Sequence, residues 1–328
     1  MSTEYRAPSV EELASASATL KRVREQVGRV IVGQKHMVDR LLIGLLADGH
    51  LLLEGYPGLA KTTAVKALAN ALSARFSRIQ FTPDLLPADV LGTQIYNPRE
   101  GGFSTRQGPI FANIVLADEI NRAPAKVQSA LLEAMQERQV TIADQTFTLP
   151  RPFLVLATQN PIEQEGTYSL PEAQVDRFIM KIVVGYPTAA EEREIMERAA
   201  RPAETPGAVL TPETILAMQQ LTRRVLIRPA LADYIVALVQ STRGAGAGSS
   251  RVARYIQVGA SPRATLALAA AARGVALLDG REYAVPDDIK DIALDVLRHR
   301  ILLNYEAEAE SITADHVVQE ILATVKTP

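Results

Sequence analysis

Short apolar runs alternate with helical patterns along the first 187 residues of the chain. The runs are rich in Leu, Ile and Val and nearly continuous, which is typical of strands buried on both faces of a parallel sheet. Between them, apolar residues recur at helical spacing, as at Val65, Leu68 and Leu72. This alternation predicts an α/β fold, in which a parallel five-stranded sheet is flanked by helices. The predicted strands span residues 50–54, 78–81, 113–117, 153–157 and 178–184.

Two insertions interrupt this alternation. Residues 81–111 are rich in Pro and Gly, and Gly101 with Gly102 marks a turn. Residues 139–150 alternate apolar and polar positions around residues 143–145, which predicts a β-hairpin. Because loops on a rigid α/β core often carry function, we expect both insertions to be working parts. Simple decoration of the sheet edge is the alternative.

The second half of the chain has a helical pattern. Residues that predict helix N-caps stand at Thr211, Ser261 and Thr313, each followed by proline or by an acidic residue in the first turn. No internal repeat is visible. The sequence therefore predicts two domains, an α/β core over residues 1–187 and an all-α domain over residues 188–328.

Composition and charge exclude several classes of protein. A chain of 328 residues with 47% hydrophobic and 22% charged residues is ordinary for a globular protein and long enough for two domains. The net charge of −2 gives no basis for nucleic acid as a main partner. The absence of Cys excludes disulfides and thiolate metal sites, and the four His form no zinc-hydrolase motif. With no signal peptide and no apolar run long enough to span a bilayer, we expect a cytoplasmic protein.

The strongest chemical motif lies between the first predicted strand and a predicted helix. Gly55 and Gly58 allow backbone N–H groups to turn toward phosphate oxygens, and the helix N-terminus favours an anion. Lys61 would contact the β- and γ-phosphates of ATP, and the Thr62 hydroxyl would bind Mg²⁺. The general pattern has glycine where Ala60 stands, and alanine is tolerated there if that position has a helical φ. The nucleotide-binding residues predicted in this loop are Gly55, Pro57, Gly58, Leu59, Ala60, Lys61, Thr62 and Thr63.

Two adjacent acids form the second half of this predicted site. Asp118 and Glu119 directly follow the apolar strand at residues 113–117. Asp118 can hold Mg²⁺ through water, and Glu119 can polarise the water that attacks the γ-phosphate. Acids are common at strand ends, so this pair gains its meaning from the phosphate-binding loop.

These segments together resemble the MoxR family of AAA+ ATPases. The resemblance covers about residues 20 to 328, and the string Asp-Glu-Ile-Asn-Arg-Ala-Pro at 118–124 is highly specific. It implies a P-loop AAA+ core, a following helical lid domain, and an enzyme that uses ATP and Mg²⁺. Ala60 weakens the general P-loop pattern but matches the Leu-Ala-Lys-Thr form of this family. The matching motifs lie at residues 33–34, 59–62, 118–124, 157–161, 172–178 and 259–264.

The resemblance also implies roles for three further polar residues. Asn160 resembles sensor 1, which orients the attacking water; an Asn that merely closes a strand is the alternative. Arg177 resembles the arginine finger, which acts on the nucleotide of a neighbouring subunit and can be worth roughly 10³–10⁵ in rate. An ion pair with Asp176 or Glu172 is the alternative. Arg263 resembles sensor 2 in the first turn of a lid helix, where the helix dipole disfavours a cation unless an anion is near. An exposed lid arginine is the alternative.

The same resemblance extends to the adenine pocket and to the insertions. Val32 and Gly33 match the segment that lines the adenine pocket, although Val32 read alone would be a core residue. The insertions at 81–111 and 139–150 match the helix-2 insert and the pre-sensor-1 hairpin, a layout that also resembles magnesium chelatase motor subunits. We therefore expect these loops to contact a partner.

The resemblance implies a chaperone-like motor that assembles as a ring, which we expect to be a hexamer. Its expected partners are proteins that carry von Willebrand factor A domains. Two alternatives stay open: a nucleotide-gated binding module with little hydrolysis, and a DNA-associated motor. The presence of Glu119, Asn160 and Arg177 together counts against the first. The near-neutral charge and the lack of Lys or Arg in residues 141–148 count against the second.

Overall fold

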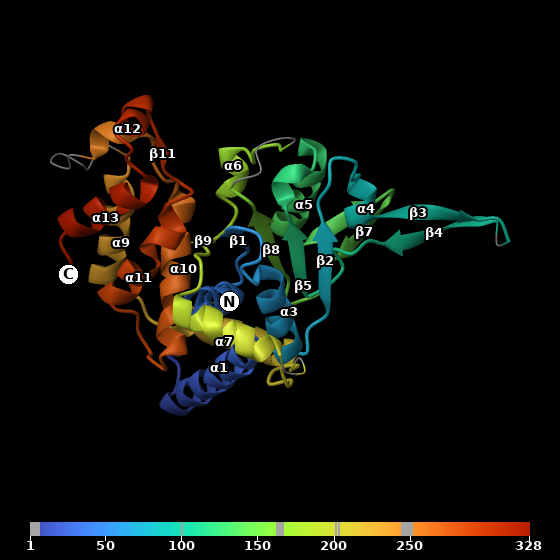
Figure 1. The fold of residues 1–328 in the computed structure, drawn as a ribbon, viewed down its shortest axis with the longest axis horizontal. Coiled ribbons are helices and arrows are strands. Elements are labelled where there is room, and N and C mark those ends of the chain that lie inside the picture. Colours follow the sequence, from blue (N-terminus) through green and yellow to red (C-terminus); the bar gives the residue numbers. More distant parts are fainter. Residues whose placement is uncertain (1–6, 100, 162–166, 201, 203, 244–251) are drawn as a thin grey trace, which may run out of the picture.

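The computed structural model describes residues 7–99, 101–161, 167–200, 202, 204–243 and 252–328. Its central element is a parallel sheet of five strands in the order β2-β5-β8-β1-β9 (Figure 1). The predicted five-stranded parallel sheet is therefore confirmed, and the strand ends differ from the prediction by at most two residues. The strands are β1 (Leu51–Glu54), β2 (Phe76–Gln80), β5 (Ile114–Asp118), β8 (Leu154–Gln159) and β9 (Met180–Val183).

The sheet is apolar on both faces because successive side chains point to opposite sides of a strand. In β1, Leu51 and Leu53 belong to one hydrophobic cluster and Leu52 to the other. The first cluster includes α1 (Val10–Val30), α2 (Lys35–Leu46) and α3 (Lys61–Ala71), whereas the second includes α5 (Ala125–Glu137). The continuous apolar runs in the sequence thus reflect a sheet covered on both sides.

Both insertions form β-hairpins. Residues 139–150 contain the predicted hairpin, as β6 (Gln139–Ile142) paired with β7 (Gln145–Thr148). The Pro/Gly-rich insertion contains α4 (Pro87–Leu91) and a second hairpin of β3 (Gly92–Asn97) and β4 (Gly102–Gln107). The β3–β4 hairpin projects from the body of the molecule as a long arm (Figure 1).

Helices dominate the chain after β9. The predicted N-caps are confirmed, since the Thr211, Ser261 and Thr313 side chains each accept a hydrogen bond from a backbone N–H. The prediction of an all-α domain is wrong in one detail: β10 (Ile256–Val258) pairs antiparallel with β11 (Leu302–Leu303). These short strands carry no periodic pattern that would mark them in the sequence. The remaining helices are α6 (Glu172–Val175), α7 (Ala189–Ala199), α8 (Pro212–Arg224), α9 (Pro229–Ser241), α10 (Pro262–Leu278), α11 (Pro286–Leu297), α12 (Tyr305–Ala309) and α13 (Ala314–Thr324).

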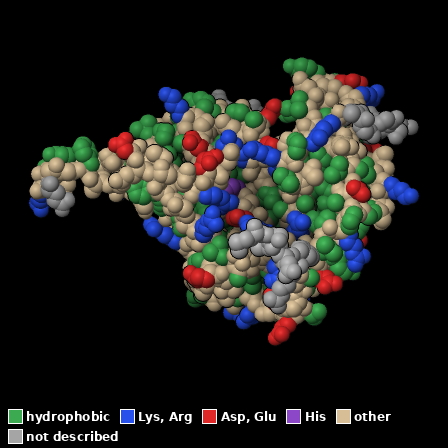
Figure 2. All heavy atoms as spheres, turned by 180° about the vertical axis from the view of Figure 1, so that it is seen from behind, with side chains coloured by type: hydrophobic (Ala, Val, Ile, Leu, Met, Phe, Trp, Pro, Cys, Tyr) green, Lys and Arg blue, Asp and Glu red, His purple; other side chains and the backbone are tan. Residues whose placement is uncertain are grey.

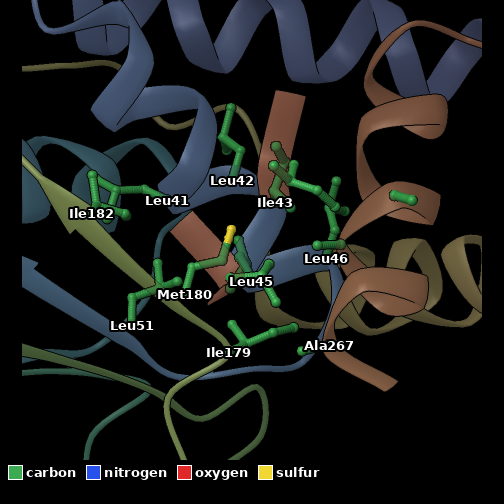
Figure 3. Close-up of a cluster of buried hydrophobic side chains, with 14 of the residues drawn as sticks. Leu41, Leu42, Ile43, Leu45, Leu46, Leu51, Ile179, Met180, Ile182 and Ala267 are labelled. Carbon is green, nitrogen blue, oxygen red and sulfur yellow. The ribbon is translucent and has the colours of Figure 1, made fainter. Parts of the chain in front are cut away.

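The N-terminal helices join the α/β sheet to the later helices. Figure 3 shows side chains of α2 meeting residues of β1 and β9 in one apolar cluster, with Ala267 of α10 beside them. Arg40 of α2 is 3% exposed and pairs with Asp295 (2.7 Å) and Asp291 (2.9 Å) of α11. The predicted boundary at residue 187 falls between β9 and α7, but the two parts share a hydrophobic core. No helix in the described ranges combines the length and the hydropathy that a membrane span requires.

Candidate functional site

The phosphate-binding loop connects β1 to α3 through two backbone positions with positive φ. Gly58 has φ +83° and Ala60 has φ +56°. Ala60 does not have the helical φ that would make it easy to accommodate, because this residue adopts the left-handed conformation that glycine tolerates best. The loop therefore keeps the geometry of the general glycine pattern even where it lacks the glycine. The helix that follows begins at Lys61, so its N-terminus faces this turn.

The loop forms one wall of a cavity at the carboxyl ends of the strands, which we name the P-loop pocket. In open α/β sheets this edge is where ligands bind. Ten of the predicted site residues line this cavity, and all of them come from the loop or from the strand ends around it. The P-loop pocket is lined by Pro57, Gly58, Leu59, Ala60, Lys61, Thr62, Thr63, Arg78, Asp118, Glu119, Thr158, Gln159 and Asn160.

Lys61 is half-buried at the base of this pocket. Its Nζ donates to the backbone carbonyls of Gly55 and, at 3.2 Å, of Tyr56. Burial lowers the pKa of Lys61, and the nearby carboxylates of Asp118 and Glu119 oppose that shift. A phosphate group beside the ammonium would act in the same direction as these carboxylates and favour its charged form.

Asp118 is anchored from two sides. Its Oδ1 accepts a hydrogen bond from the Thr158 hydroxyl (2.6 Å), and its Oδ2 accepts from both Nε (2.9 Å) and Nη2 (2.6 Å) of Arg78. Thr62 and Asp118 line the same pocket. A hydroxyl and a carboxylate are the hard oxygen ligands that Mg²⁺ prefers, so these residues fit a magnesium ion.

Glu119 lies one residue beyond β5 and has φ +56°. Its backbone N–H donates to the Thr158 hydroxyl (2.8 Å), so the same threonine holds both acids. Its Oε2 accepts hydrogen bonds from Gln80 (2.7 Å) and Arg122 (3.0 Å). The carboxylate is thereby fixed in the P-loop pocket beside the end of β8.

Asn160 directly follows β8 and is 7% exposed in the P-loop pocket. It lines the pocket together with the phosphate-binding loop, which suits an amide that orients a water molecule. The structure thus brings together Lys61, Thr62, Asp118, Glu119 and Asn160, as the sequence predicted.

Four polar residues of this site were not identified from the sequence: Arg78, Gln80, Arg122 and Thr158. Arg78 and Gln80 are separated by one residue on β2, and β2 pairs with β5 so that Gln80 lies opposite Asp118. For Arg78 and Gln80, the sequence does contain a signal: polar residues alternate at the carboxyl end of β2, the strand next to β5, which ends at Asp118.

Arg177 and Arg263 do not line the P-loop pocket. They line a separate hollow, which we name the Arg177–Arg263 hollow, together with Asp176 and Arg300. Arg177 donates to the Leu132 carbonyl (2.9 Å). The ion pair considered for Arg177 is not seen in the described part of the chain, since Asp176 pairs with Arg300 (2.8 Å) instead.

Arg263 is exposed in the first turn of α10. The Ser261 hydroxyl, which caps this helix, donates to Asp176 (2.8 Å), so α10 is fixed to the segment that carries Arg177. The two arginines therefore lie together in one hollow, and this hollow is separate from the P-loop pocket of the same subunit.

Val32 and Gly33 line a third hollow, between the end of α1 and α7. Val32 is buried, and Gly33 has φ +64°. A Cβ atom at Gly33 would lie 2.3 Å from Oε1 of Glu191, the end of a flexible side chain, and the positive φ favours glycine at this position. The helix α7 has no buried residue in the described structure, although it covers this hollow.

Known proteins similar to this chain agree with this arrangement. A family model described as "ATPase family associated with various cellular activities (AAA)" matches residues 50–180, and one described as "AAA lid domain" matches residues 248–321. The crystal structure of a proposed ATPase from Cytophaga hutchinsonii is 50% identical, with a TM-score of 0.91 over 97% of both chains.

Two named relatives carry the family name. Chaperone MoxR1 of Mycobacterium tuberculosis is 51% identical over 319 residues, which are 97% of this chain and 85% of that protein. Protein MoxR of Methylorubrum extorquens is 31% identical over 94% of each chain. With the phosphate-binding loop, the paired acids and these relatives in agreement, the chain belongs to the MoxR family of AAA+ ATPases and is an enzyme that hydrolyses ATP.

Proposed function

We propose that this ATPase is a chaperone-like motor that remodels or activates partner proteins as a ring of identical subunits, with each active site shared between two neighbours. The observation that carries the proposal is the division of the site residues between the P-loop pocket and the Arg177–Arg263 hollow. A single subunit holds both halves, but on separate faces. Head-to-tail contact between subunits would bring the halves together.

Within one subunit, we assign the binding and the hydrolysis to the P-loop pocket. Lys61 would contact the β- and γ-phosphates, and Thr62 with Asp118 would hold Mg²⁺, which would neutralise phosphate charge. Glu119 accepts a proton from the attacking water, and the Asn160 amide orients that water. The hydrogen bonds from Gln80 and Arg122 keep the carboxylate of Glu119 in place.

From the neighbouring subunit, we assign Arg177 and Arg263 to the phosphates. A guanidinium supplied in trans stabilises the charge of the transition state, and two of them on one face would act on the same nucleotide. Their shared hollow and the Ser261–Asp176 hydrogen bond, which links the two segments, support this assignment. The number of subunits in the ring, which we expect to be six, stays a prediction.

The adenine base is assigned to the hollow lined by Val32 and Gly33. We propose that the domain boundary lies at residue 187, in the link between β9 and α7, so that movement of the later helices follows the nucleotide. We further propose that the β3–β4 and β6–β7 hairpins contact the partner, a protein with a von Willebrand factor A domain. The cytoplasmic location stays a prediction.

Nucleotide binding and phosphate release test this proposal. Lys61→Ala should abolish ATP binding, whereas Glu119→Gln should bind ATP and lose turnover by a factor of roughly 10² or more. In the unaltered protein, specific activity should rise with protein concentration, and Arg177→Ala should remove that rise. Normal steady-state turnover in Glu119→Gln would refute the assigned chemistry.

The same measurements separate the alternatives. A nucleotide-gated binding module would bind ATP but release little phosphate at any protein concentration. A DNA-associated motor would show phosphate release that DNA increases. A pull-down with Glu119→Gln in ATP should identify the partner, because the arrested protein holds nucleotide and partner together.

A further inference from the structure

Arg78 is a cation in the P-loop pocket for which the proposed mechanism has no role. It lies on β2, the edge strand of the sheet, and its side chain is 50% exposed. Both hydrogen bonds that it makes to Asp118 end on the same oxygen, Oδ2, at 2.9 and 2.6 Å. Asp118 itself is only 12% exposed at the side chain.

The acceptor capacity of Asp118 is nearly used by these contacts. An ionised carboxylate offers about four lone-pair positions, two on each oxygen. Arg78 occupies both positions on Oδ2, and the Thr158 hydroxyl occupies one on Oδ1. A single position is left for a water molecule bound to Mg²⁺. A divalent cation beside Asp118 would also repel the guanidinium.

Arg78 reaches beyond Asp118 into the rest of the pocket. Its Nη2 donates to the Gln80 side-chain oxygen (2.8 Å), and the Gln80 amide donates to Glu119 (2.7 Å). A continuous path of hydrogen bonds thus connects the carboxylate assigned to the metal with the carboxylate assigned to the water. Arg78 lines the same pocket as Lys61, so its charge lies in the cavity assigned to the phosphates.

We infer that Arg78 is a displaceable counter-ion of Asp118, which competes with Mg²⁺ for this carboxylate and, while no metal is bound, balances the negative charge that Asp118 and the triphosphate bring together. The inference rests on the proposed nucleotide site and adds a positioning residue that controls how metal and nucleotide enter it. In this role Arg78 weakens metal binding and strengthens binding of metal-free nucleotide. A merely structural ion pair would not change these two quantities in opposite directions.

The test is equilibrium binding of a fluorescent, slowly hydrolysed ATP analogue, mant-AMP-PNP, in EDTA and over a series of free Mg²⁺ concentrations. Arg78→Met keeps the length of the side chain and removes its charge. We expect the free Mg²⁺ at half-saturation to fall about fivefold, and the affinity in EDTA to weaken about fivefold, as for a partly exposed ion pair. Arg78→Lys keeps the charge and should hold the EDTA affinity near that of the unaltered protein.

Arg75→Met is the matched control, because Arg75 directly precedes β2 and does not line the P-loop pocket. It should leave both quantities unchanged. An Mg²⁺ midpoint in Arg78→Met equal to that of the unaltered protein, or a shift of both quantities in one direction, overturns the inference. If the unaltered protein fails to bind the analogue with Mg²⁺, the nucleotide site itself is refuted, so the two failures are distinct.

Discussion

Ala60 adopts the backbone conformation that the phosphate-binding loop requires, at a cost in conformational strain. At φ +56° its Cβ is crowded by the neighbouring backbone, which costs an L-residue about 1–2 kcal/mol. Glycine avoids this crowding but loses about 0.5–1 kcal/mol more conformational entropy on folding. Ala60 is exposed, so a change there removes little packing. The strain of the positive φ and the conformational entropy of glycine therefore decide how a substitution changes the free energy of unfolding.

We therefore expect Ala60→Gly to raise the free energy of unfolding by up to about 1.5 kcal/mol, the difference between these two terms. Ala60→Val should lower it, because a β-branched side chain is worse in this conformation. Urea unfolding of the three proteins measures the difference. A loss of stability in Ala60→Gly would show that the positive φ is not strained.

Individual residues were predicted with unequal success for a physical reason. Lys61, Thr62, Asp118 and Glu119 belong to contiguous motifs, whose chemistry can be read from local spacing. Arg78 could not be found in this way, because its role depends on a strand neighbour 40 residues away.

Elements were predicted where they bury an apolar face. The β6–β7 hairpin was found because Val140 and Ile142 are buried and alternate with exposed residues. The β3–β4 hairpin was not, since both of its strands lack buried residues and carry no alternation to detect. An element that buries no apolar face leaves no periodic signal in the sequence.

The β3–β4 arm carries an exposed aromatic pair. Tyr96 and Phe103 lie opposite each other, with ring centroids 5.3 Å apart, and are 53% and 70% exposed. Figure 2 shows hydrophobic side chains at the end of this arm, away from the body of the molecule. Rigid aromatic side chains are frequent anchors in protein interfaces, which supports the proposed contact with a partner.

Changing both rings to serine should leave folding and basal ATP hydrolysis intact and remove partner capture. We expect the free energy of unfolding to change by no more than about 0.5 kcal/mol, since the residues are exposed. Capture is measured by pull-down in the Glu119→Gln background. Thr93→Ser with Arg106→Ser, on the same hairpin, is the control and should capture normally. Equal capture by both double variants would contradict a role for the aromatic pair.

At the scale of the whole molecule, the five-stranded sheet and the order of an α/β core followed by a helical part were predicted. How the later helices pack against the N-terminal helices was not predicted. Arg263 was expected to lie near an anion such as phosphate or to be an exposed lid arginine, and the structure shows it exposed in a hollow shared with Arg177. That location depends on where α10 packs against α2 and on the buried Arg40–Asp295 pair. Contacts between residues this far apart leave no trace in local spacing.

Because the P-loop pocket and the Arg177–Arg263 hollow are separate, two inactive variants should restore ATP hydrolysis when they are mixed. Lys61→Ala lacks a nucleotide site but keeps its arginines, whereas Arg177→Ala has the opposite defect. In randomly mixed rings, about a quarter of the junctions would join an intact pocket to an intact arginine. Phosphate release by the mixture should then exceed the sum of the separate proteins. No gain on mixing would show that Arg177 serves its own subunit, and that each chain is complete by itself.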